Sequence, residues 1–182
     1  TGMERTFIPC IIPYSAIGNT VPIILSDIEN KEDLLLLYAN LSCFVFDFIS
    51  RIKISRVHMS FYIFEQLPIF KPEKYGLKLK KEIIPKIINL CYTSHNLDDF
   101  AEEMGYKKEP FIWNQNKRNL LEADLNAIFA HLYKIDKEEF DYILETFNNL
   151  KRKDIDEYGE FKTKHLVLKA YDKYAQQPEL FE

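Results

Sequence analysis

The spacing of apolar residues in the first part of the chain predicts short strands around one long helix. Residues 5–13 (RTFIPCIIP) and 20–25 (TVPIIL) are rich in β-branched and aromatic side chains, and their prolines remove backbone donors, which is typical of short or edge strands. The stretch 15–19 (SAIGN) between them predicts a turn. Residues 58–70 (HMSFYIFEQLPIF) return to strand character and end at Pro68.

Residues 30–53 (NKEDLLLLYANLSCFVFDFISRIK) carry the start and stop signals of a single helix. Asn30 is a typical N-cap residue, acidic side chains occupy the first turn, and cations occupy the last turn. Because the apolar positions surround nearly the whole helix, we expect most of it to be buried.

The second part of the chain has helical spacing throughout. Leu121, Leu125, Ile128 and Phe129 recur at intervals of three and four residues, as on one face of an amphipathic helix. The pattern predicts helices over 78–92 with an interruption at Pro85, over 95–106, within 111–135 and over 137–151, and TKHLVLKAYDKYA (163–175) closes the helical part. The sequence therefore predicts an α+β protein, with a mixed α/β lobe over 1–76 and a helical lobe over 77–182.

Composition restricts the possible partners and the compartment. The 182 residues are 47% hydrophobic, enough to bury a core. The net charge is −4, so nucleic-acid binding would have to come from a local basic patch. Cys10, Cys43 and Cys91 are far apart in apolar surroundings, which fits buried thiols in a reducing cytoplasm. No segment is typical of a membrane span, and the start TGMERTF suggests a piece of a larger protein.

The sequence contains no recognisable catalytic or metal-binding motif. The glycines form no phosphate-binding pattern, the histidines have no metal-ligand spacing, and no serine has the context of a nucleophile elbow. An independent small enzyme is therefore disfavoured, and we assign no catalytic residue and no metal ligand.

A cationic stretch follows the long helix. Arg51 and Lys53 fall in the last helical turn, where positive charge is favoured by the helix dipole. Arg56 and His58 lie beyond that turn, beside Ser60, and the dipole explains them poorly. Such groups on a loop can contact phosphates and base edges, so DNA contact and ordinary charge complementarity both remain open.

Three segments resemble the C-terminal target-recognition region of adenine-specific DNA methyltransferases of restriction–modification systems, above all the type IIG-like fused enzymes. The segments are ERTFIPCIIPYSAIGNT (4–20), LLLYANLSCFVFDFISRIKISRVHMSFYIFEQLPI (35–69) and LEADLNAIFAHLYKIDKEEFDYILETF (121–147). The residues that match the family pattern in the first two segments are Arg5, Thr6, Ile12, Pro13, Gly18, Asn19, Asn40, Ser42, Phe46, Asp47, Arg51, Lys53, His58, Gln66, Leu67 and Pro68.

The resemblance implies a region that reads DNA without modifying it. The family's Asn-Pro-Pro loop is missing here, so this chain should need no cofactor, whereas the parent enzyme would use S-adenosylmethionine, and Mg²⁺ if it cleaves DNA. Gly18 and Asn19 would form a turn, and Gln66 and Pro68 would close a strand. The expected DNA-binding residues are Arg5, Thr6, Arg51, Lys53, Arg56, His58 and Ser60.

The expected partners are double-stranded DNA and the remaining catalytic domains of the parent protein, in the cytoplasm of a bacterium or archaeon. An alternative is a protein–protein interaction module that docks a partner subunit through the amphipathic helices of 121–147.

Overall fold

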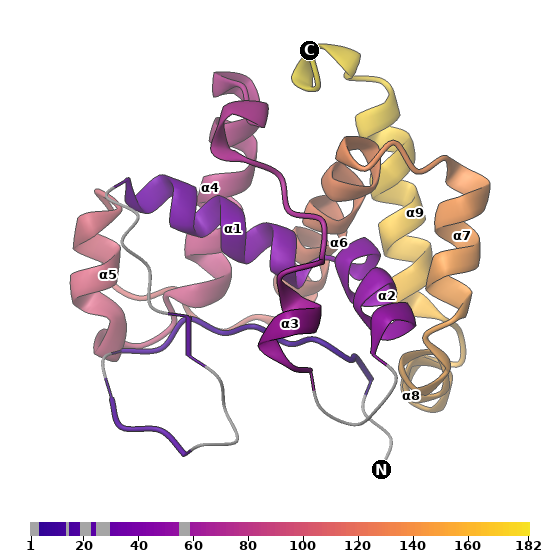
Figure 1. Cartoon of the computed structure of the whole chain (residues 1–182), viewed down its shortest axis with the longest axis horizontal. Coiled ribbons are helices and arrows are strands. Elements are labelled where there is room, and N and C mark those ends of the chain that lie inside the picture. The colour runs from indigo at the N-terminus through magenta and orange to yellow at the C-terminus, as the bar shows by residue number, and fades with distance from the viewer. Residues whose placement is uncertain (1–3, 14, 19–22, 25–29, 55–58) are drawn as a thin grey trace.

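The computed structural model describes residues 4–13, 15–18, 23–24, 30–54 and 59–182, and it is helical (Figure 1). No β-strand occurs within these ranges, so the expected α+β class is wrong and the described chain is all-helical. The α-helices are α1 (Lys31–Ser42), α2 (Phe44–Lys53), α3 (Phe61–Phe64), α4 (Leu77–Cys91), α5 (Asp98–Glu103), α6 (Gln115–Leu132), α7 (Lys137–Glu145), α8 (Asn148–Tyr158) and α9 (Lys162–Ala175). Short 3₁₀ turns cover Pro72–Lys74, His95–Leu97 and Pro178–Leu180.

The long helix expected over 30–53 is broken into α1 and α2. Asn30 caps α1 as predicted, with its side chain accepting from the Glu32 N–H at 3.1 Å. The chain becomes extended at Cys43, and the two helices bend by 63°. The Phe44 N–H, freed at the start of α2, donates to Asn126 Oδ1 at 2.7 Å, so a buried amide from α6 satisfies it.

Where the structure describes them, the segments expected to be strands take other forms; of 20–25 only residues 23–24 are described. Residues 4–13 run extended, and the Thr6 and Phe7 N–H groups donate to the carboxylate of Asp47 instead of to a strand. Within 58–70, Ser60 caps the single turn of α3, its side chain accepting from the Ile63 N–H at 3.4 Å. Similar short apolar stretches therefore occur here in a helical turn and in irregular chain, so their composition alone does not identify a strand.

One hydrophobic cluster joins residues from both expected lobes. It includes Leu35 and Phe46 from the first range and Ile83, Phe129 and Leu144 from the second. Helix α6 packs along α9 and also contacts α2 and α4, while α1 lies across α4 (Figure 1). This arrangement places α2 against α6 and α7, with its C-terminal end at the edge of the packed helices.

Helix α4 continues through Pro85, where the sequence predicted an interruption. Buried Ile83 and Ile87 on either side of this proline hold the helix against the core and offset the lost backbone bond. Within the described ranges no single helix is long and apolar enough to cross a membrane; α1 and α2 meet that test only together, across their bend.

Candidate nucleic-acid interface

The buried carboxylate of Asp47 contacts Arg5, Thr6 and Arg51, which match the family pattern, and Phe7, which follows Thr6. Asp47 on α2 is fully buried and accepts from Arg5 Nε at 3.1 Å and from Arg51 Nη2 at 3.4 Å. The backbone N–H groups of Thr6 and Phe7 each reach its Oδ2 at 3.0 Å. Two guanidinium groups and two amides satisfy this charge, as a buried carboxylate requires. We call these residues the Asp47 clasp.

The two arginines of the clasp make further contacts within the chain. Arg51 Nη1 donates to the Thr146 carbonyl at 2.8 Å, and its guanidinium lies 4.1 Å from the centre of the Phe147 ring. Arg5 Nη2 donates to the Cys43 carbonyl at 3.2 Å. Arg5 and Arg51 therefore fix the N-terminal segment and the end of α7 to α2, and their charges are already compensated in part by Asp47.

The remaining expected DNA-binding residues surround the α2–α3 connection. Lys53 is exposed at the end of α2, and exposed Ser60 caps α3. Arg56 and His58 lie outside the described residues. Two aromatic side chains that follow Ser60 are also exposed: Phe61 is 68% and Tyr62 is 75% exposed. We call Lys53, Ser60, Phe61 and Tyr62 the α2–α3 corner.

The sequence analysis named neither Phe61 nor Tyr62 among the expected DNA-binding residues and placed both in a strand. Their signal in the sequence is Ser60, a residue that favours the N-cap of a helix rather than a strand interior.

The four residues expected to have architectural roles differ in what they do. Gln66 Nε2 donates to the Tyr62 carbonyl at 3.0 Å, so it does bond to the backbone, but to a helical turn and not to a strand. The Pro68 carbonyl accepts from the Tyr133 hydroxyl at 2.8 Å, which ties the segment to the end of α6. Gly18 is exposed in an irregular segment, and Asn19 lies outside the described residues.

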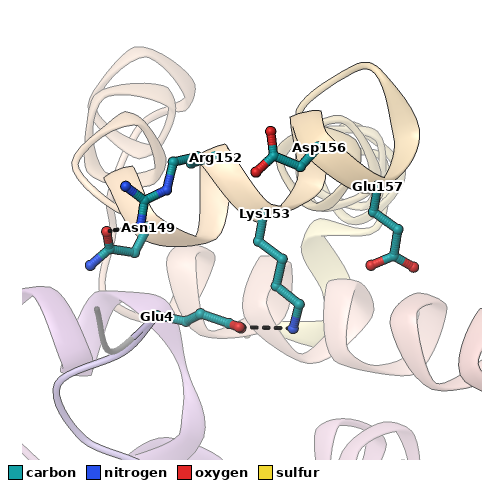
Figure 2. A pocket seen from close by; sticks show the side chains of 6 residues that line it. All are labelled: Glu4, Asn149, Arg152, Lys153, Asp156 and Glu157. Atoms are coloured by element: carbon teal, nitrogen blue, oxygen red, sulfur yellow. Dashed lines mark hydrogen bonds and ion pairs between the residues drawn. The ribbon is translucent and has the colours of Figure 1, made fainter. Parts of the chain in front are cut away.

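A shallow hollow of about 440 Å³ lies on α8, near the start of the described chain (Figure 2). Lys153 pairs with Glu4 across it at 2.8 Å, and Arg152 contacts Asn149 at 3.3 Å. Asp156 and Glu157 complete its lining. Its lining carries three acids and two cations, so it offers no net positive field for phosphate.

A second cavity, of about 320 Å³, lies beneath the N-terminal segment. Its wall includes Arg5, Arg118 and Glu122; partial desolvation beside this cavity raises the pKa of Glu122, while the two arginines act in the opposite direction. Of the cysteines, Cys43 is buried as expected, whereas Cys10 is exposed, because the segment expected to be a strand lies on the surface. Within the described ranges no three potential ligands converge as a metal site would require.

Comparison of this chain with protein-family models, with curated proteins and with solved structures gives no significant match.

Proposed function

We propose that the chain is a DNA target-recognition region of a restriction–modification adenine methyltransferase, and that it meets the duplex at the α2–α3 corner. The observation that carries the proposal is that the residues flanking the segment with Arg56 and His58 along the chain, Lys53 before it and Ser60, Phe61 and Tyr62 after it, are exposed. Cations and hydroxyl groups bind phosphates, and a histidine or arginine can read base edges.

The Asp47 clasp gives this surface a rigid base. Arg5 and Arg51 hold the N-terminal segment and α7 to α2, so the helix that presents Lys53 is tied to two other parts of the chain. Within the proposed interface the phosphate contact falls to Lys53 and base reading to Arg56 or His58, while Arg5, Thr6 and Arg51 support the interface from beneath. The methyl transfer, S-adenosylmethionine and any Mg²⁺-dependent cleavage belong to the rest of the parent protein.

The alternative function, docking of a partner subunit through the helices of 121–147, has less support. Leu125, Phe129, Phe140 and Leu144 on those helices are buried in the core of this chain. Their apolar faces are therefore already covered, and a partner would have to bind elsewhere.

Selection of bound sequences from a pool of random DNA duplexes tests the proposal. We expect this chain to enrich a defined sequence, and Arg56→Ala to relax the preference at one position by about 1–3 kcal/mol if Arg56 reads a base. Lys53→Gln should weaken binding to all duplexes alike and reduce the salt dependence by about one counterion. Lys169→Gln, an exposed lysine on α9, is the matched control. Recovery of no preferred sequence, with Lys53→Gln and Arg56→Ala binding like the control, would refute the assignment.

A further inference from the structure

Two large apolar side chains stand next to each other on the surface between α5 and α6. Ile112 is 93% exposed and Trp113 is 60% exposed. Folding normally covers such groups, and neighbouring exposed apolar residues mark interaction sites more often than isolated ones do. The connection is anchored just before them by the Phe111 N–H, which donates to the Tyr92 carbonyl at 2.9 Å.

The indole of Trp113 is held in place although it is exposed. The guanidinium of Arg118 lies 3.8 Å from the centre of the indole ring, and the indole N–H donates to Gln115 Oε1 at 3.3 Å. Arg118 is itself fixed, because its Nη1 donates to the Leu90 carbonyl at the end of α4 at 2.8 Å. An aromatic ring oriented before binding loses little conformational freedom when a ligand stacks on it.

The chain on either side of this ring carries an excess of positive charge, which favours an anionic ligand. Residues 107–119 contain four cationic side chains and one acidic one, although the whole chain has a net charge of −4. The exposed members include Lys107, Lys108 and Lys117. Exposed amides at Asn114, Gln115 and Asn116 add donors and acceptors. An apolar protein surface would explain Ile112 and Trp113 but not the surrounding cations, whereas nucleic acid combines aromatic faces with phosphates.

We propose that Ile112 and Trp113 form a contact for an unstacked base of bound DNA, with the neighbouring lysines on the adjoining phosphates. The proposal rests on DNA recognition as the function and adds a second contact to the α2–α3 corner. In Figure 1 both α3 and the chain that leads from α5 to α6 lie in the lower half of the molecule. Apolar side chains that wedge between base steps, and aromatic rings that receive displaced bases, are established ways of holding deformed DNA.

The single tryptophan of the chain makes the test direct, since its fluorescence reports on Trp113 alone. Titration with a mixed-sequence duplex and with the corresponding single strand should quench this fluorescence to saturation, more strongly for the single strand, whose bases are already unstacked. Trp113→Ala should weaken single-strand binding about tenfold, and Trp113→Phe, which keeps a stacking face, should retain most of the affinity.

Leu77→Ala is the matched control, because Leu77 is 79% exposed at the opposite end of α4 from Leu90. It should bind DNA like the wild-type chain. If DNA binds and Lys53→Gln weakens it, but the fluorescence stays constant and Trp113→Ala binds within twofold of wild type, the base contact is refuted while the proposed function stands. If the chain binds neither duplex nor single strand at low salt, both proposals fail.

Discussion

Replacing Asp47 with asparagine is expected to lower the free energy of unfolding by about 3 kcal/mol, because it leaves two partly buried guanidinium groups without their counter-charge. Arg5 and Arg51 expose only 21% and 34% of their side chains, so water cannot fully compensate them. The Thr6 and Phe7 N–H groups would also lose an ionised acceptor, which is the stronger kind of hydrogen-bond partner.

Urea unfolding followed by circular dichroism measures this loss. Asp172→Asn is the matched control: Asp172 pairs with Lys137 on the surface, with both side chains about half exposed, and its loss should cost less than about 1 kcal/mol. Equal effects of the two substitutions would show that the Asp47 clasp contributes no more than a surface ion pair.

Replacing Phe129 with alanine is expected to cost about 4 kcal/mol, the range for removing a fully buried aromatic ring. Phe129 lies on α6, and the ring of Tyr75 packs edge-on against it at 6.3 Å between centroids. Because residues 1–76 and 77–182 contribute to one cluster around this ring, we expect a single unfolding transition in the variant.

Two probes test whether the variant unfolds in a single transition: circular dichroism reports on the helices, and tryptophan fluorescence reports on the connection before α6. Their transitions should coincide at a lower urea midpoint. Phe61→Ala is the matched control, because it also removes a phenylalanine ring, but one that is 68% exposed. It should change the free energy of unfolding by no more than about 0.5 kcal/mol. Two separate transitions in Phe129→Ala would mean that the two ranges fold independently.

Local signals predicted helices over most of the second part, although the helix expected over 137–151 divides into α7 and α8. The Asp136 and Glu139 side chains form a capping box at the start of α7, and Gly105 adopts a positive φ after α5, near the predicted end of that helix. The strands were wrong because short apolar runs with β-branched residues do not distinguish a strand from an extended segment or a buried turn. A strand depends on a pairing partner elsewhere in the chain, which no local pattern reveals.

The candidate site shows the same limit. Asp47 lies 42 residues away from Arg5, and nothing near Arg5 in the sequence indicates this partner. The sequence alone therefore predicts that the Arg5 guanidinium is available to DNA. Arg51 follows Asp47 by one helical turn, and this spacing in the sequence predicts the ion pair that the structure shows. The sequence FIWNQNKRN (111–119), with its mixture of aromatic, amide and cationic residues, carried the signal for the Trp113 surface and was overlooked.

The way the Asp47 clasp holds the N-terminal segment has a consequence for how this protein can change in evolution. The Asp47 carboxylate accepts hydrogen bonds from the main-chain N–H groups of Thr6 and Phe7. Every residue except proline supplies such an N–H group. After these two residues, exposed positions such as Ile8 and Cys10 can acquire new side chains while the hydrogen bonds to Asp47 keep the main chain in place. The surface can therefore diversify rapidly along this stretch on an unchanged framework.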